Sequence, residues 1–223
     1  MESTLKKCGE HGRDYHVSEI LLCHNGSYMP PEIAKILNDL PQNTRLLHTD
    51  VKGLGAGYKL GIANATSEYV VLSADDIPFG FSDIDYFINH QCPKNADIAV
   101  GSKAHLNSKI FMGIHRKIIS TGFRICREVI LNKNLPKDTQ GTIIAPLEIA
   151  KKLANKCILD DYFFSLEFLY IAHLSGYSTI EIPVTMDENY YKSSEPSTIR
   201  IFRDSLKAIS SFSKIKKNHG ARY

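Results

Sequence analysis

The sequence predicts an α/β fold, in which helices flank a doubly wound and mostly parallel sheet. Short apolar runs typical of buried strands alternate with amphipathic stretches typical of helices. Consecutive runs end in polar or glycine-rich turns, and the ligand crevice of such a sheet lies at the carboxyl ends of its strands. The 223 residues, of which 43% are hydrophobic, suffice for one substantial domain or for a domain with a small appendage.

Strands are expected where apolar and β-branched residues dominate a short segment. In chain order these segments are residues 20–23 (ILLC), 44–48 (TRLLH), 69–73 (YVVLS), 97–100 (DIAV), 142–144 (TII) and 178–182 (STIEI).

Helices are expected in the stretches between these strands. The first opens on Pro31, whose fixed φ suits the first position of a helix. The others repeat apolar residues every three or four positions, which gathers them on one helix face. The expected helices are residues 31–40, 57–65, 82–90, 116–131 and 162–175.

The composition argues against several classes of protein. A net charge of +3 with interleaved signs does not indicate nucleic-acid binding. The amino terminus lacks the apolar core of a signal peptide, and no stretch approaches the roughly 18 apolar residues that span a bilayer, so membrane contact is expected to be peripheral at most. The cysteines are odd in number and lack C-x-x-C spacing, which favours a reducing cytoplasm over a disulfide framework or zinc site. They are Cys8, Cys23, Cys92, Cys126 and Cys157.

A glycine-rich turn follows the second expected strand. Gly53, Gly55 and Gly57 precede Asp75 by about 20 residues, as a dinucleotide-binding fingerprint requires. However, Tyr58 stands where the third glycine of that fingerprint belongs. A tight turn and close helix packing therefore explain the glycines better than a dinucleotide site, although an oxidoreductase remains an alternative.

Two carboxylates follow the third expected strand. Carboxylate oxygens at a strand end can bind Mg²⁺ or Mn²⁺, and such a cation can bridge the two phosphates of a nucleotide diphosphate leaving group. We expect Asp75 to be the metal ligand, whereas Asp76, next to Ile77 and Pro78, is expected to cap the turn.

Several short motifs together resemble family 2 glycosyltransferases of the inverting, GT-A-folded (Rossmann-like) kind. The resemblance runs from about Val17 to Leu206 and is to the branch that includes dolichyl-phosphate β-glucosyltransferase and dolichol-phosphate mannose synthase. Residues 52–75 resemble the stretch from a glycine-rich helix start to the D-x-D motif, 97–105 (DIAVGSKAH) the G-S-R-A-H segment, and 138–141 (DTQG) the D-T-Q-C-G segment. Residues 164–167 (FSLE), 181–184 (EIPV) and 192–194 (KSS) are similar to F-D-V-E, E-V-P-V and the G-S-K end.

The resemblance implies transfer of a hexose from UDP-glucose or GDP-mannose to a polyprenyl or dolichyl phosphate, with Mg²⁺ or Mn²⁺ bound by Asp75. It implies that Asp138 and Gln140 face the sugar and the reacting centre and that Arg116 neutralises charge there. Contacts with the nucleotide sugar are expected from Asn25, Lys52, Gly53, Ser73, Asp75 and Lys103, and contacts with the acceptor phosphate from Arg116, Arg124 and Lys192.

Each role has a structural alternative. Arg116 and Arg124 lie two helical turns apart on one face, so they form either a cationic patch or an ordinary solvated face. Asp138 could simply cap a turn. Glu167 falls within an apolar helix, where a lone carboxylate is costly, so we expect it to pair with a cation or a backbone donor.

The chain departs from the family pattern at several positions. Ser73 stands at the first aspartate of D-x-D, and Lys103 replaces an arginine, which keeps the charge and loses the bidentate geometry. His24 and Asn25 replace the two aspartates of a D-D-G-S turn. The opening strand of the family has no counterpart, so we expect an exposed edge or a gap beside residues 20–23. These departures motivate an alternative to the leading glycosyltransferase hypothesis, a catalytically impaired GT-A-like domain that acts by binding or partnership.

The carboxyl-terminal segment reads as an amphipathic basic helix and tail, residues 199–223, appended to a GT-A-like domain of residues 1–198. It is expected either to lie in a membrane interface, at the cytoplasmic face, or to pack on the sheet. Its apolar positions are Ile199, Phe202, Leu206, Ile209, Phe212 and Ile215.

Overall fold

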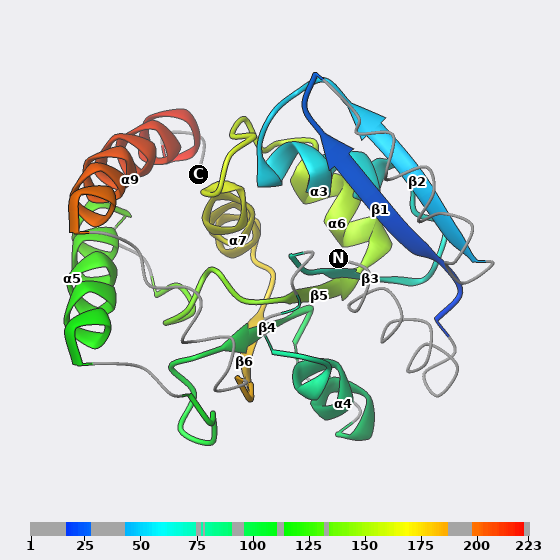
Figure 1. The fold of residues 1–223 in the computed structure, drawn as a ribbon, viewed down its shortest axis with the longest axis horizontal. Helices are drawn as coiled ribbons and strands as arrows, with labels where there is room; N and C mark the ends of the chain where they lie inside the picture. Colours follow the sequence, from blue (N-terminus) through cyan, green and yellow to red (C-terminus); the bar gives the residue numbers. More distant parts are fainter. Residues whose placement is uncertain are drawn as a thin grey trace. The chain divides into compact units, whose positions relative to one another are not determined.

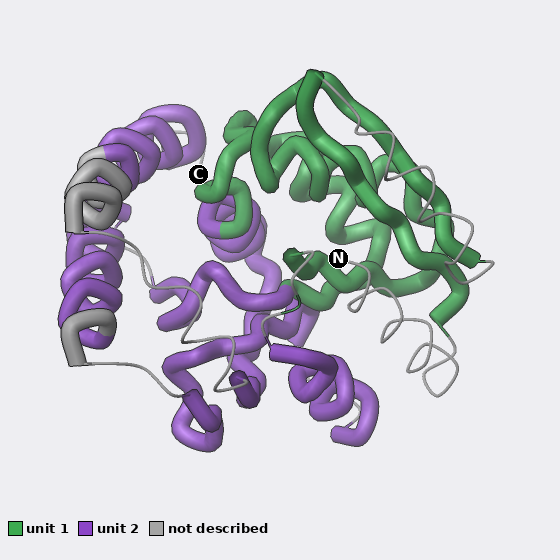
Figure 2. Tube along the Cα trace, in the orientation of Figure 1, with its two compact units in different colours: residues 1–77, 143–165 green, residues 78–142, 166–223 purple. Residues whose placement is uncertain are grey.

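The computed structural model describes residues 17–27, 43–74, 77, 79–90, 96–110, 114–131, 134–186 and 198–220, without the side chains of 114–116 and 198–206. The chain forms two compact units (Figure 2): unit 1 comprises residues 1–77 and 143–165, and unit 2 comprises 78–142 and 166–223. The elements drawn in Figure 1 are β1 (Ile20–Asn25), β2 (Thr44–Thr49), α3 (Leu54–Asn64), β3 (Tyr69–Leu72), α4 (Ser82–Asn89), β4 (Ile98–Ser102), α5 (Ile114–Leu131), β5 (Ile143–Pro146), α6 (Leu147–Ala154), α7 (Phe164–Leu174), β6 (Thr179–Pro183) and α9 (Thr198–His219).

The α/β class expected from the sequence is confirmed, since each of the six expected strands is present within a few residues of its expected place. Four of the expected helices are present as α3, α4, α5 and α7. The expected helix at 31–40 lies outside the described residues, and the short helix α6 was not expected.

Unit 1 contains two strand pairs of opposite kind. Strands β1 and β2 run parallel, with Ile20 opposite Thr44, whereas β3 and β5 run antiparallel, with Tyr69 opposite Pro146. Helix α3 packs against β1, β2 and α6, and α6 packs in turn against β3 and β5. The helices therefore connect the two pairs through a core of buried side chains that includes Ala56, Ile62, Leu72, Ile143, Ile144, Leu147 and Leu153.

One edge of β1 has no strand beside it within the described part of the chain, because β1 pairs there with β2 alone. Residues 1–16 lie outside the described ranges, so the expectation that they supply no strand stays a prediction.

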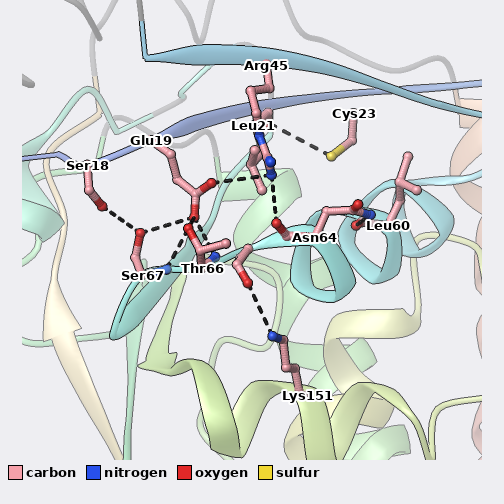
Figure 3. Close-up of polar contacts among 11 residues, drawn as sticks. Ser18, Glu19, Leu21, Cys23, Arg45, Leu60, Asn64, Thr66, Ser67 and Lys151 are labelled. Carbon is pink, nitrogen blue, oxygen red and sulfur yellow. Dashed lines mark hydrogen bonds and ion pairs between the residues drawn. The ribbon is translucent and has the colours of Figure 1, made fainter.

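The carboxylate of Glu19, which directly precedes β1, holds the turn that precedes β3 (Figure 3). Its Oε1 accepts hydrogen bonds from the backbone N–H of Thr66 at 2.6 Å and of Ser67 at 3.3 Å, and from both hydroxyls. Arg45 of β2 places Nη2 at 3.4 Å from the other oxygen. The N–H of Thr66 is the largest cause that lowers the pKa of Glu19, so this carboxylate stays ionised and fixes the start of β1 relative to that of β3.

Unit 2 is built on the parallel pair of β4 and β6, in which Ile98 lies opposite Thr179 and Ser102 opposite Pro183. All five residues of β4 are buried. Helices α5 and α9 pack together, and the rings of Phe123 and Phe212 meet edge to face with centroids 5.1 Å apart.

The described side chains of α9 bury its apolar face within unit 2. Phe212 and Ile215 are fully buried, and Ala208 and Ser211 nearly so. His219 Nε2 lies 2.7 Å from Glu167 Oε1 of α7, and both residues are buried, so Glu167 has a side-chain partner within the fold. The two expectations for this helix were a membrane interface and packing on the sheet; its described side chains instead pack on helices α5 and α7. None of the described helices has the length and apolar character needed to cross a membrane.

Replacing His219 with alanine is expected to lower the free energy of unfolding by about 1 to 3 kcal/mol, because a buried carboxylate loses a hydrogen-bond partner. Urea unfolding followed by circular dichroism measures the change. Lys217, exposed on the same helix, provides the control variant Lys217→Ala, which is expected to change stability little. Equal losses in the two variants would show that the Glu167–His219 contact contributes nothing.

Candidate functional site

A polar cluster in unit 2 brings together three residues that the sequence predicted for the site. Lys103 directly follows β4, and both its backbone nitrogen and its Nζ lie 3.0 Å from Asp138 Oδ2. The backbone N–H of Gln140 donates to Asp138 Oδ1 at 3.0 Å. Lys103 Nζ also lies 5.4 Å from the centroid of the Phe79 ring. Asp138 therefore accepts two backbone N–H groups and also lies beside the ammonium group of Lys103, which is more than a simple turn cap does.

Glu181 of β6 joins this cluster, although no role was expected for it beyond membership of a motif. Its Oε1 accepts hydrogen bonds from Ser102 Oγ at 2.6 Å and from the backbone N–H of Asp138 at 3.2 Å. Ser102 Oγ in turn accepts the N–H of Ala104 at 3.1 Å. One carboxylate thus contacts both the end of β4 and the segment that carries Asp138. The sequence feature that could have indicated this role is a charged residue between two isoleucines of a strand.

Arg127 of α5 is a second residue that the sequence analysis missed. It is 1% exposed, and its Nη1 donates to the carbonyl oxygen of Pro136 at 2.8 Å. Burial is the largest cause that lowers the pKa of its guanidinium, and the charge of Glu128 opposes that shift. The signal was its position four residues from both Phe123 and Leu131, on the apolar face of the helix.

The other two arginines of α5 are those that the sequence favoured. Arg124 is half-buried, and its charge acts on Arg127. Arg116 lies on α5, and its side chain is outside the described part of the chain. Their roles at an acceptor phosphate stay predictions.

Gly141 packs directly against the backbone of β4. A Cβ at this position would overlap the carbonyl oxygen of Gly101. The N–H of Gly101 also donates to the carbonyl oxygen of Thr142 at 2.8 Å. Glycine is therefore required at 141 so that the segment carrying Asp138 can approach β4 this closely.

The glycine-rich turn of unit 1 packs against the backbone of Asp160 and Asp161. Gly53 has a φ of 128°, and a Cβ there would overlap the backbone of Asp160. At the start of α3, the N–H of Gly55 donates to Asp161 O at 3.2 Å and the N–H of Ala56 donates to Asp160 O at 3.0 Å. Asn25, predicted to contact the nucleotide sugar, donates from Nδ2 to Gly53 O at 2.9 Å.

These contacts remove the basis of the dinucleotide interpretation. A dinucleotide site needs the first N–H groups of the helix for a pyrophosphate. In this turn the N–H groups of Gly55 and Ala56 already bond to the chain. The alternative reading of the glycines, a tight turn with close packing, is what the structure supports.

The remaining predicted residues belong to unit 1 or fall outside the described residues. Lys52 is exposed before α3, and Ser73 is half-buried directly after β3. Ile77, in the turn that follows, has a φ of 38°, which is strained for a β-branched residue. Asp75, Asp76 and Lys192 are not among the described residues. Within the described ranges no three His, Cys, Asp or Glu side chains are grouped as metal ligands, so a metal at Asp75 stays a prediction.

Comparison with known proteins identifies the family. Glucosyl-3-phosphoglycerate synthase from Mycobacterium tuberculosis, whose crystal structure contains Mn²⁺, UDP-glucose and phosphoglyceric acid, is similar to this chain with a TM-score of 0.62. The match has 13% sequence identity and covers 96% of this chain and 76% of the synthase, so it shows a shared fold, that of GT-A glycosyltransferases. The model of glycosyl transferase family 2 matches residues 1–153. This chain therefore belongs to glycosyl transferase family 2.

Proposed function

We propose that this chain transfers a hexose from a nucleotide sugar, UDP-glucose or GDP-mannose, to the phosphate of a polyprenyl or dolichyl phosphate. Membership of the family supports a glycosyltransferase. The observation that carries the proposal is the Lys103–Asp138 pair at the end of β4, in which an ammonium group lies beside a carboxylate. Phosphate and sugar hydroxyls are the ligands that suit such a set of groups.

The proposed reaction needs little acid–base chemistry from the protein. A phosphate monoester has a second pKa of about 6, so its oxygen is already ionised at neutral pH. That oxygen attacks the anomeric carbon and forms a new C–O bond, while the bond from this carbon to the donor diphosphate breaks and the diphosphate leaves with the electron pair. Catalysis then reduces to positioning and to stabilisation of charge.

The described residues can be assigned to those two tasks. The side chain of Lys103 is 27% exposed, so its ammonium group can turn from Asp138 toward a phosphate oxygen. Asp138 and Gln140 would face the sugar, and Arg124 would support the acceptor phosphate. Mg²⁺ or Mn²⁺ is expected to assist departure of the diphosphate, with Asp75 as its ligand, and the similar synthase was solved with Mn²⁺.

Replacing Lys103 with alanine is expected to weaken binding of the nucleotide sugar about tenfold or more, because a charged hydrogen bond is typically worth about 1.5 to 3 kcal/mol. Calorimetric titration of UDP-glucose and GDP-mannose, each with and without Mn²⁺, measures the effect. Lys117, exposed on α5, provides the charge-matched control Lys117→Ala. Failure of the wild-type chain to bind either nucleotide sugar under any of these conditions would overturn the proposal.

The acceptor is tested separately with a short-chain polyprenyl phosphate and a soluble phosphate monoester. Transfer to the lipid phosphate alone supports the proposed acceptor. Equal transfer to both compounds would mean that the enzyme recognises the phosphate group and not the lipid chain. Because the described face of α9 is packed within unit 2, a lipid acceptor would have to be reached by another surface.

A second function, that of a catalytically impaired binding domain, is favoured by Ser73. A half-buried hydroxyl stands after β3 where the family pattern has a carboxylate, and a hydroxyl binds a divalent cation less strongly. Binding of the nucleotide sugar without turnover, together with stronger metal-dependent binding in Ser73→Asp, would support this second function.

A further inference from the structure

We propose that Arg127 and Glu181 are positioning residues that hold the Asp138 loop, residues 134–142, from two sides. Neither residue is expected to touch the substrate. The effect of the anchors on catalysis rests on the proposed function, in which Asp138 faces the sugar. The anchoring itself is a property of unit 2 and can be measured without any substrate.

The first anchor is the carboxylate of Glu181. Its Oε1 accepts the N–H of Asp138 at 3.2 Å and the hydroxyl of Ser102 at 2.6 Å. Because Glu181 lies opposite Val100 in the parallel pairing of β6 with β4, its register is fixed by the strand hydrogen bonds. One oxygen atom of Glu181 therefore bonds to both the loop and the end of β4. Since β4 leads directly into Lys103, this contact sets the position of Asp138 relative to Lys103.

The second anchor is the guanidinium of Arg127, which comes from α5. Its Nη1 donates to Pro136 O at 2.8 Å, two residues before Asp138. The side chain is 1% exposed, so water does not compete for this bond. The negative charges of Asp138 and Glu181 both act on the guanidinium and favour its charged form. The two anchors thus contact the loop at Pro136 and at Asp138 and attract one another electrostatically.

A cavity explains why the loop depends on these anchors. The cavity has a volume of about 330 Å³ and borders the loop at Asn134, Leu135 and Pro136, with Glu181 and residues of α7 among its other walls. Where the loop lines this cavity, no other side chain packs against it, so it gains fewer dispersion contacts on that side. Directed polar bonds and the close approach of Gly141 to β4 are then what hold Asp138 in place.

Removing the Glu181 anchor is expected to lower kcat for hexose transfer about tenfold or more and to change the KM for the nucleotide sugar less than about threefold. The reason is that a misplaced Asp138 affects the transition state more than the bound substrate. Glu181→Ala tests this, and Glu181→Gln should recover most of kcat because an amide oxygen can still accept both hydrogen bonds. Thr179→Val, two residues earlier on the same face of β6, is the control.

Hydrogen exchange provides the readout that does not depend on activity. In Glu181→Ala and in Arg127→Lys, the amides of the Asp138 loop are expected to exchange at least about tenfold faster, together with that of Gly101, which bonds to Thr142 O. The amides of residues 98–100 of β4 are expected to exchange as in the wild-type chain. Arg127→Lys keeps the positive charge and loses the planar donor geometry of the guanidinium. This conservative variant keeps the inference testable if Glu181→Ala fails to fold. Unchanged exchange of the loop in both variants would overturn the inference.

The two proposals can fail separately. If the wild-type chain transfers no hexose but the loop exchanges faster in the variants, the proposed function is wrong and the anchoring stands. If Glu181→Gln loses as much kcat as Glu181→Ala, the negative charge and not the hydrogen-bond geometry matters, and the positioning role is wrong.

Discussion

Replacing Gly141 with alanine is expected to lower the free energy of unfolding by about 4 kcal/mol or more, which places it among the most damaging single changes. The added Cβ would overlap the carbonyl oxygen of Gly101. The backbone cannot move aside cheaply, because the hydrogen bond from Gly101 N to Thr142 O, at 2.8 Å, holds the same two segments together. The Asp138 loop must therefore detach from β4 or β4 must distort.

Thermal unfolding measures this effect. A loss of about 4 kcal/mol corresponds to a fall in Tm of roughly 8 to 16 °C for a chain of this size. Gly122, on the exposed face of α5 with no atom within 4 Å of an added Cβ, provides the matched control. Gly122→Ala is expected to stabilise the protein by about 0.5 to 1 kcal/mol, since alanine is the better helix former. A small change in Gly141→Ala would mean that the two backbones are less closely packed than described.

Replacing Asp138 with asparagine is expected to reduce hexose transfer about 100-fold or more. The substitution keeps the size of the side chain and removes the charge that faces Lys103 Nζ at 3.0 Å. If the new amide group turns its NH₂ toward Lys103, two donors oppose each other where the carboxylate accepted two bonds. Removing one preorganised electrostatic contact in an active site typically costs two to three orders of magnitude in kcat.

The assay is the steady-state rate with a polyprenyl phosphate acceptor, alongside thermal unfolding to confirm that the variant folds. Glu148→Gln, an exposed carboxylate on α6, is the control and is expected to transfer at the wild-type rate. A loss smaller than about threefold in Asp138→Asn would exclude Asp138 from the reacting centre and leave it a structural role.

The strands could be predicted from the sequence because each contains a short run of apolar residues. Such a run can be recognised from local composition alone, without knowledge of tertiary contacts. Helix α3 begins at Leu54 and not at residue 57, because the approach of Gly53 and Gly55 to Asp160 fixes its start, and that contact joins residues about a hundred positions apart. Helix α6 is eight residues long and directly follows Pro146 of β5, so its pattern is too short to separate from the strand.

The candidate site was predictable where a motif carried it and not where tertiary contacts did. Lys103, Asp138 and Gln140 belong to motifs and do lie together. Arg127 is a buried charge and Glu181 a half-buried one, and both contact residues distant in the sequence. Local sequence argues against burying a charge, so neither role could be predicted before these partners were known. For α9, the alternation of apolar and basic residues suits a membrane interface and a protein core equally, and only the burial of Phe212 and Ile215 separates the two.

A ribosome making this chain completes β3 long before the strand that pairs with it. The 70 residues 73–142 separate β3 from β5, which at about 5 to 20 residues per second take roughly 4 to 14 s to synthesise. During that interval the strand edge that β5 will cover stays open on the nascent chain, next to the apolar side chains of Tyr69 and Val71. Unpaired edges of this kind associate with other chains, so the yield of folded protein should depend on translation speed and on chaperones that bind nascent strands.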